Sequence, residues 1–228
     1  MCATKIDVDR LVNQSKSQLL NDKPLLIISH WDLDHIHGLI ALSHEGFDKF
    51  FSGLICVNAI KSITAKRIFA EFDDLNGINV SCIRVSPKTS RGANAMHLVS
   101  RNKNNTISLY QGEDNRNINY SGLSMFVKGM STSVIFTGDM KLSQAMNVYA
   151  QELSLGIETQ EHILIVPHHG GDTTKVNRIY SEPCTEAIIS VGPNSYGHPA
   201  TGMLNYLTNL TNGNVTRTDT QGDVVRSI

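Results

Sequence analysis

The chain has 228 residues, of which 40% are hydrophobic and 18% are charged, and its formal net charge is −1. This length can bury one sizeable core, and the near-neutral charge excludes the basic face of a sequence-specific DNA-binding protein. No apolar run approaches the ~18–20 residues that a membrane-spanning helix needs, and the first ten residues lack the apolar stretch of a secretory signal. We therefore expect one domain over residues 1–228, cytoplasmic and without a membrane segment.

The first half of the chain alternates helical and strand patterns. In chain order we expect a helix over 7–21, a strand over 25–29, a helix over 36–44, a strand over 53–57, a helix over 59–75 and a strand over 78–85. The polar stretch 86–105 has no clear period, and we expect it to form a long surface loop.

The second half continues the alternation. In chain order we expect strands over 106–110, 122–128 and 132–137, a helix over 141–154, a strand over 162–166, a helix over 173–180, a strand over 186–191, a helix over 200–210 and strands over 214–218 and 223–226. Mixed strands and helices on this scale predict a layered α/β domain.

The four cysteines are widely spaced and form no Cys-x-x-Cys pair: Cys2, Cys56, Cys82 and Cys184. Disulfide frameworks and cysteine-rich zinc sites are therefore not expected. Cys56 and Cys82 stand within apolar runs, so we expect both to be buried free thiols.

Four of the expected strands run directly into clusters of His, Asp, Asn and Gly, within 25–35, 133–140, 162–171 and 187–199. In layered α/β folds the ends of strands deliver side chains into a shared crevice. Each cluster also has an ordinary interpretation: a turn at Asp139, a surface loop at His168 and His169, and a helix cap at His198. One shared site accounts for all four clusters, whereas the ordinary interpretation needs four coincidences.

The most specific cluster is His30-Trp-Asp-Leu-Asp-His35. If the strand extends through it, His30, Asp32 and Asp34 point the same way and His35 follows on the turn. His30 and Asp32 could then bind one metal ion and Asp34 and His35 a second, with Asp139 bridging through its two carboxylate oxygens. Two metal ions about 3.5–4 Å apart would activate a water and stabilise charge on a phosphoryl oxygen.

These motifs resemble the metallo-β-lactamase family, whose signature is a His-x-[His/Asp]-x-Asp-His motif, a downstream Gly-Asp and a later His. Within it, the chain is most similar to the hydrolase domain of ComEC-type competence proteins. This closer resemblance rests on Asp32, where most relatives have His, and on the stretches FTGD at 136–139, VPHHG at 166–170 and SVGPNSYGHP at 190–199. It covers about residues 25–228 and implies an αββα sandwich of mixed sheets.

The resemblance implies a hydrolase of phosphodiester bonds with two divalent metal ions, acting in the ComEC-like branch on DNA as a nuclease. It implies these metal ligands: His30, Asp32, Asp34, His35, Asp139 and His169. The implied catalytic residues are Asp34, His168 and His198, with His168 facing the phosphate and His198 protonating the leaving oxygen. Asn194 and Lys141 are implied to contact the substrate.

The chain departs from the family pattern at two places that matter for the site. Only 29 residues precede His30, and they contain neither of the β-hairpins with which the family begins. A shortened chain, a partner chain that completes the fold or a misplaced start would each explain this. Many relatives also supply a His near the position of Asn119, so the first metal is expected to have one nitrogen ligand fewer.

The ligand chemistry predicts which ions bind. Asp32 makes the first site rich in oxygen, which suits Mn²⁺ or Mg²⁺, whereas the nitrogen ligands of the second site suit Zn²⁺. We expect two divalent ions, Mn²⁺ or Zn²⁺.

The substrate is less tightly specified by the sequence. Six basic residues within 84–116 form either a solvated loop or an edge that tracks phosphates of a single strand: Arg84, Lys88, Arg91, Arg101, Lys103 and Arg116. We expect a nucleic acid, DNA rather than RNA. The alternatives are a cyclic-nucleotide or other small phosphodiester hydrolase, and a non-catalytic regulatory or assembly module on the same fold.

Overall fold

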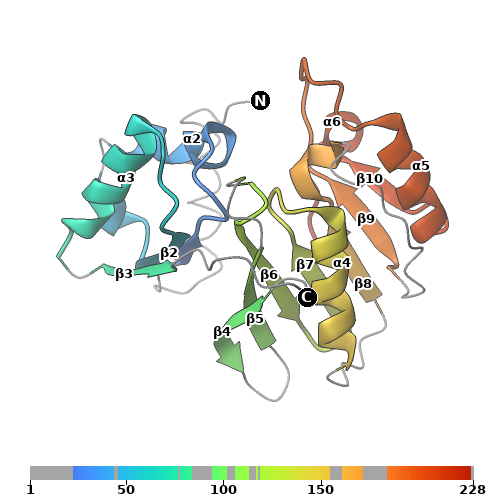
Figure 1. Cartoon of the computed structure of the whole chain (residues 1–228), viewed down its shortest axis with the longest axis horizontal. Helices are drawn as coiled ribbons and strands as arrows, with labels where there is room; N and C mark the ends of the chain where they lie inside the picture. Colours follow the sequence, from blue (N-terminus) through green and yellow to red (C-terminus); the bar gives the residue numbers. More distant parts are fainter. Residues whose placement is uncertain are drawn as a thin grey trace. The chain divides into compact units, whose positions relative to one another are not determined.

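The computed structural model describes residues 23–43, 46–76, 78–83, 94–101, 106–112, 117, 119–154, 161–171 and 184–226; for residues 83, 94–101 and 153–154 we describe only the backbone. The chain divides into two compact units, Met1–Val85 and Ser86–Ile228 (Figure 1). Each unit contains its own sheet with helices, which confirms the α/β class. The helices expected over 7–21 and 173–180 lie outside the described residues.

The first unit contains a sheet of three parallel strands in the order β1 (Leu25–Ile27), β2 (Gly53–Val57) and β3 (Asn79–Ile83). Parallel strands need crossover connections. These are made by helix α2 (Leu33–Leu42) with the 3₁₀ turn η1 (Phe47–Lys49), and by helix α3 (Ile63–Asp73). All three strands were expected from the sequence, with ends that differ by two residues or fewer.

Helix α2 begins earlier than its expected start at residue 36. Asp32 is its extended N-cap residue, and Asp34 lies in the first turn, where the positive end of the helix dipole stabilises a carboxylate. The expectation that the strand extends through Asp34 is therefore wrong. His30 and Asp32 lie on the connection after β1, while Asp34 and His35 lie on the helix.

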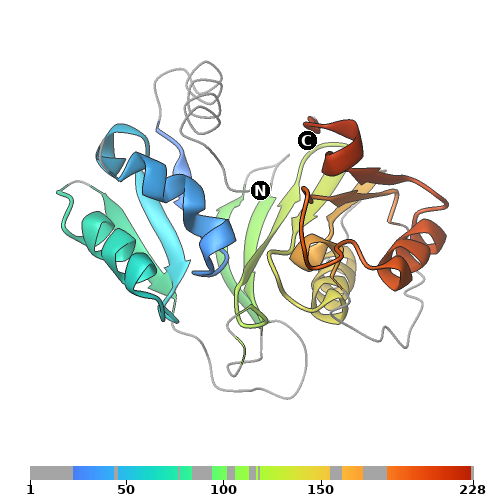
Figure 2. The ribbon, with the colours of Figure 1, turned by 90° about the horizontal axis from the view of Figure 1, so that it is seen from above.

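The core of the first unit forms where α2 and α3 pack side by side (Figure 2). Its fully buried side chains include Ile36 and Leu42 from α2 and Ile68 from α3. Phe47 and Phe72 stack with their ring centroids 4.1 Å apart. The indole Nε1 of Trp31 donates to the carbonyl of Val57 at 2.7 Å, which anchors the segment after β1 to the end of β2.

The register of β2 and β3 places Cys56 directly opposite Cys82. Cys56 is buried, as expected, but Cys82 is exposed, so the expectation of a buried thiol there is wrong. Cys82 lies on β3, the last strand in the order of this sheet, where one flank of the strand has no described neighbour. Burial is the main cause that raises the pKa of each thiol.

The second unit contains a seven-stranded mixed sheet in the order β10-β9-β8-β7-β6-β5-β4. Its strands are β4 (Asn94–Arg101), β5 (Thr106–Gln111), β6 (Leu123–Lys128), β7 (Thr132–Phe136), β8 (Glu161–Ile165), β9 (Glu186–Ile189) and β10 (Val215–Arg217). Strands β4 to β7 pair antiparallel, whereas β7 to β10 are all parallel. The carboxyl ends of β7 to β10 therefore lie at one edge of the sheet.

Strand β4 corrects the expectation of a loop over 86–105. It pairs with β5, but its register shifts twice, between Ala95 and His97 and between Leu98 and Ser100. At each shift β4 has one extra residue, which interrupts the alternation of its residues between the two faces of the sheet. A bulged strand does not alternate regularly between apolar and polar residues, so its sequence shows no period of two.

Two helices, α4 (Leu142–Ser154) and α5 (Thr201–Leu210), share one hydrophobic core with the sheet (Figure 1). Met146 and Tyr149 from α4 and Met203 and Leu207 from α5 are buried in it. The chain ends with the short helix α6 (Thr218–Gln221) and an irregular segment over 222–226, where a strand over 223–226 was expected. No helix within the described residues combines the length and the apolar character needed to cross a membrane.

Candidate functional site

The first cluster consists of His30, Asp32, Asp34 and His35, all in the first unit. The hydroxyl of Ser29 lies 3.2 Å from Nδ1 of His30 and 3.2 Å from Nδ1 of His35. The two imidazole rings lie 4.1 Å apart, centroid to centroid. A single hydroxyl therefore orients both rings through their Nδ1 atoms.

The other ring nitrogens lie near carboxylates. Nε2 of His30 is 3.8 Å from Oδ2 of Asp32, and Nε2 of His35 is 3.8 Å from Oδ2 of Asp34. Two ligand atoms that are each ~2.1 Å from one ion, at a tetrahedral angle, lie about 3.4 Å apart. The first unit thus brings these four residues together in the two pairs that the sequence predicted. The distance between the ligand atoms of each pair is slightly longer than the distance expected around a bound divalent ion.

The second cluster consists of Asp139, His168, His169 and His198, all in the second unit. Asp139 follows β7, the two adjacent histidines follow β8 on the 3₁₀ turn η2 (Pro167–Gly170), and His198 lies in the segment after β9. Because these strands are parallel neighbours, all four residues lie at the carboxyl edge of the sheet, where α/β folds build their sites. Nε2 of His168 is 3.9 Å from Oδ2 of Asp139, and the rings of His168 and His198 are 5.5 Å apart.

His168 and His169 both have left-handed backbone conformations, with φ values of 50° and 54°. This region is disfavoured for residues with a Cβ atom, and each such residue costs of order 1–3 kcal/mol. The amide of His168 donates to the carbonyl of Gly138 at 3.1 Å, which ties the turn to the segment bearing Asp139. Strain at two successive histidines in a polar cluster points to a functional role for their placement.

The two glycines that follow are required by close contacts. A Cβ atom on Gly170 would lie 2.7 Å from Cβ of Pro199, and one on Gly171 would lie 2.8 Å from Cε1 of His198. The ring of His198 therefore packs directly against the backbone of Gly171, and a side chain at position 171 would displace the His198 ring.

The hydrogen bonding distinguishes the two adjacent histidines. Nδ1 of His169 is 2.7 Å from the carbonyl oxygen of Ser190, so Nδ1 donates and Nε2 carries the lone pair that a metal needs. Such support from a backbone carbonyl is typical of metal-binding histidines. His168 has no such support, because among the described residues its buried Nδ1 atom has no hydrogen-bond partner. This difference favours His169 as the ligand, as the resemblance implies.

Asn119 lies beside Asp139. Its Nδ2 atom is 3.4 Å from Oδ2 of the carboxylate, which is a weak hydrogen bond that helps to orient Asp139. The sequence identified Asn119 as the position near which relatives supply a further histidine, and the structure places it next to a predicted ligand. Lys141 lies two residues beyond Asp139, with its Nζ atom 4.7 Å from the centroid of the Tyr120 ring. Its predicted contact with substrate stays a prediction.

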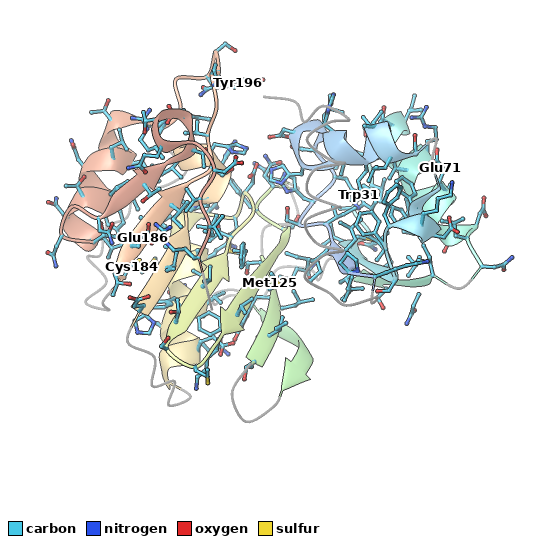
Figure 3. All side chains as sticks on the ribbon, turned by 180° about the vertical axis from the view of Figure 1, so that it is seen from behind. Trp31, Glu71, Met125, Cys184, Glu186 and Tyr196 are labelled. Atoms are coloured by element: carbon cyan, nitrogen blue, oxygen red, sulfur yellow. The ribbon has the colours of Figure 1, made fainter. Side chains whose placement is uncertain are left out.

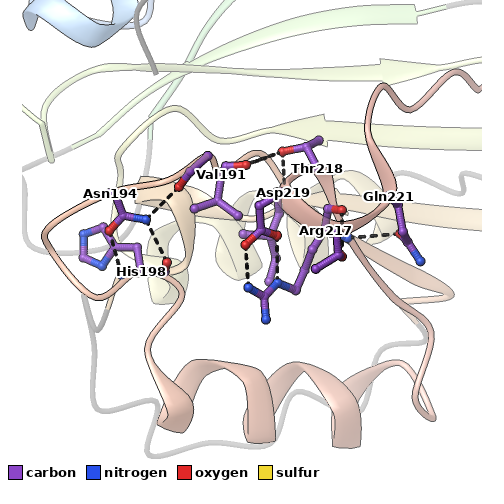
Figure 4. Close-up of polar contacts among 10 residues, drawn as sticks. Val191, Asn194, His198, Arg217, Thr218, Asp219 and Gln221 are labelled. Carbon is purple, nitrogen blue, oxygen red and sulfur yellow. Dashed lines mark hydrogen bonds and ion pairs between the residues drawn. The ribbon is translucent and has the colours of Figure 1, made fainter.

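Asn194 closes the loop that carries His198 (Figure 4). Its Nδ2 atom donates to the carbonyls of Gly192 and His198, both at 2.9 Å. Its Oδ1 atom accepts from the amides of Tyr196 at 3.1 Å and His198 at 3.0 Å. Both ends of the side chain are thus used within the loop, and the predicted contact of Asn194 with substrate stays a prediction.

The pKa of His198 is lowered below the ordinary value for histidine. Burial is the largest cause, since it disfavours the charged imidazolium, and electrostatic repulsion from the His168 and His169 side chains acts in the same direction. The carboxylate of Asp139 opposes them by stabilising the imidazolium. The neutral form of His198 therefore persists to a lower pH than the neutral form of an isolated histidine does.

Sequence reasoning missed two supporting groups: the hydroxyl of Ser29 and the carbonyl of Ser190. A serine directly before the first histidine was a visible signal, whereas the Ser190 contact depends on backbone geometry that no sequence pattern reports. Arg84, Lys88, Arg91, Lys103 and Arg116 lie outside the described residues, as does the side chain of Arg101, so the phosphate-tracking edge stays a prediction. No family model matches the chain, and no curated protein matches it in sequence.

Proposed function

We propose that the chain is a metal-dependent hydrolase of phosphodiester bonds and that it has the metallo-β-lactamase fold. Its proposed substrate is nucleic acid, with DNA preferred to RNA. The observation that carries the proposal is the second cluster: Asp139 and three histidines at the carboxyl edge of parallel strands, two of them in left-handed conformations. The first cluster supports it with two further pairs of histidine and carboxylate.

Under this proposal the chain would hold two divalent ions, Mn²⁺ or Zn²⁺. The residues that would hold them are His30 with Asp32 and Asp34 with His35 in the first cluster, and Asp139 and His169 in the second. The donor chemistry fits, because imidazoles oriented through Nδ1 and neighbouring carboxylates are what such ions bind. Bound ions lower the pKa of a coordinated water and offset the negative charge of the phosphate.

The remaining groups handle the substrate and its protons. Asp34 would accept a proton from the attacking water. Nε2 of His168 would donate a hydrogen bond to a phosphate oxygen, and Lys141 would contribute positive charge near it. His198 would protonate the leaving oxygen; its lowered pKa makes the imidazolium a stronger acid but less abundant at neutral pH.

The test is hydrolysis of bis(p-nitrophenyl) phosphate and of single-stranded DNA, double-stranded DNA and RNA by the purified chain with Mn²⁺ or Zn²⁺. We expect cleavage that a chelator abolishes. D139N and H169Q are expected to lower kcat/KM by roughly 10²–10⁴-fold, the range typical of lost catalytic groups. D74N is the matched control, since Asp74 is an exposed carboxylate at the end of α3.

Two outcomes would contradict the proposal. Wild-type protein that cleaves none of these substrates and binds fewer than one metal ion per chain would favour a non-catalytic regulatory or assembly module. Wild-type protein that cleaves cyclic nucleotides or small diesters but no polynucleotide would favour the small-phosphodiester alternative and overturn the nucleic-acid substrate.

A further inference from the structure

Tyr196 is the most exposed aromatic side chain among the described residues, with 82% of its surface accessible. It lies at the outer end of the segment that carries His198 (Figure 3). Its ring stacks on that of His198, with centroids 5.9 Å apart and planes inclined by 23°. An exposed aromatic ring thus lies in near-parallel contact with a predicted catalytic residue.

The segment that presents this ring is held in one conformation. The side chain of Asn194 makes four hydrogen bonds inside it, one of them to the amide of Tyr196 itself. At its base, the amide of Val191 donates to Oγ1 of Thr218 at 2.8 Å, and that hydroxyl donates back to the carbonyl of Val191 at 2.7 Å (Figure 4). A ring on a pre-organised segment loses little conformational freedom when a ligand stacks on it.

The surroundings of the ring indicate what the ligand is. His198 also contacts His168, and His168 lies 3.9 Å from Asp139, so the ring belongs to the same group of side chains as the predicted phosphate contacts. Aromatic side chains next to phosphate-binding groups are the stacking platforms of proteins that bind single-stranded nucleic acid. A base within a duplex is already stacked on both faces and cannot use such a platform without being extruded.

We infer that Tyr196 stacks on an unpaired nucleobase adjacent to the scissile phosphate, which makes single strands or frayed ends the preferred substrate. This inference rests on the proposed function and specifies its substrate class. A phosphodiester without a base, such as a lipid headgroup, gains nothing from this contact. Tyr196 acts as a specificity-determining residue through its ring, and its hydroxyl has no part in the stacking.

The experiment compares two substrates of equal length, oligothymidylate and an abasic sugar-phosphate strand, in Mn²⁺. Y196A is expected to raise KM for oligothymidylate by about 5- to 150-fold, the range for loss of one base–aromatic stack. The kcat value should stay within about twofold, because stacking contributes equally to ground state and transition state. The KM for the abasic strand should be unchanged.

Two variants control this comparison. Y196F keeps the ring and is expected to match the wild type within about twofold. M130A removes another exposed apolar side chain, on the turn that precedes β7, at the opposite end of that strand from Asp139. It is expected to leave both KM values unchanged.

The inference is overturned if Y196A cleaves oligothymidylate with the wild-type KM, or if Y196A weakens both substrates equally. Either result leaves phosphodiester hydrolysis itself intact. If the wild type cleaves neither strand, the proposed function fails instead. Both strands then remain intact in Mn²⁺, and their binding can be measured by fluorescence anisotropy of the labelled strands. Equal affinity of the wild type for the two strands would overturn the stacking inference.

Discussion

His198 shows how neighbouring charges set the chemistry of one residue in the second cluster. Three causes lower its pKa: burial, His168 and His169, in that order. One group raises it, the carboxylate of Asp139. Changes to these neighbours should therefore move the pKa of His198 in opposite directions.

We predict that D139N lowers the pKa of His198 further, because it removes the only cause that raises it. H168Q should raise the pKa of His198, because it removes a side chain whose electrostatic interaction lowers that pKa. The measurement is an NMR titration of the His198 ring in chelator-treated protein, with D74N as the control that leaves the titration unchanged. Shifts of the same sign in D139N and H168Q would contradict this account.

At the residue scale the sequence predicted best what is local in the chain. His30 with Asp32 and Asp34 with His35 are neighbours in sequence, and the structure brings them together in those pairs. The contact that favours His169 over His168 could not be predicted this way. It depends on a carbonyl 21 residues away in the chain and on two left-handed residues.

At the element scale most strands and helices followed from apolar periodicity, and the failures have physical causes. The two bulges of β4 hide its period. The early start of α2 reflects the carboxylate of Asp34 in its first turn, which the helix dipole stabilises, whereas the polar stretch by itself looks extended. The parallel register that joins Cys56 to Cys82 could not be predicted from their separation in sequence.

This register predicts unequal reactivity of the cysteines. Iodoacetamide should modify Cys82 in the native protein before Cys56 or Cys184, because only Cys82 of these three is exposed. The reaction should be slow at neutral pH and faster in alkali, because the pKa of the Cys82 thiol is raised. Peptide mass mapping over time measures each site separately. Equal labelling of Cys56 and Cys82 in folded protein would contradict the described register and burial.

A second element-scale prediction concerns the end of the chain, where Arg226 binds Glu186 on β9. Nε of Arg226 donates to Oε2 of Glu186 at 2.9 Å, its Nη2 atom donates to Oε1 at 2.6 Å, and Oγ1 of Thr216 also donates to Oε1 at 2.8 Å. The hydrogen bonds from Arg226 are the largest cause that lowers the pKa of the nearly buried Glu186 carboxyl. R226A should cost roughly 1–3 kcal/mol of unfolding free energy near neutral pH.

The sign of its pH dependence follows from that lowered pKa. A carboxyl with a lower pKa in the folded state stabilises the fold at pH values above its unfolded pKa, and this stabilisation is lost as the pH falls through the folded pKa. The difference between wild type and R226A should therefore shrink in acid. Urea denaturation at neutral and acidic pH measures it, with R67A as the control for an exposed arginine in an i,i+4 pair with Glu71. A difference that persists unchanged in acid would contradict the assignment.

At the scale of the whole molecule, each unit has a cluster of histidine and aspartate side chains that follows the carboxyl ends of its parallel strands. The sequence predicted both clusters and the α/β class. The sequence could not predict that the chain divides into two compact units. Apolar periodicity indicates which face of a helix or strand is buried, but not which elements pack together.

If both clusters serve one reaction, their substitutions should not be additive. D34A in the first unit and H169Q in the second should each lower kcat/KM strongly, and the double variant should lose little more than either alone. Both should also reduce the bound metal, measured by elemental analysis, and the rise in Tm that added Mn²⁺ produces. Losses that multiply in the double variant would indicate that the clusters act independently.

The left-handed pair at His168 and His169 has a consequence for how the protein tolerates mutation. Replacing His168 by glycine relieves about 1–3 kcal/mol of backbone strain, against roughly 0.5–1 kcal/mol for the greater freedom of glycine in the unfolded chain. H168G should therefore unfold at an equal or slightly higher urea concentration while losing hydrolysis. Selection for stability alone would remove this histidine, so the turn is a position where stability and activity favour different residues.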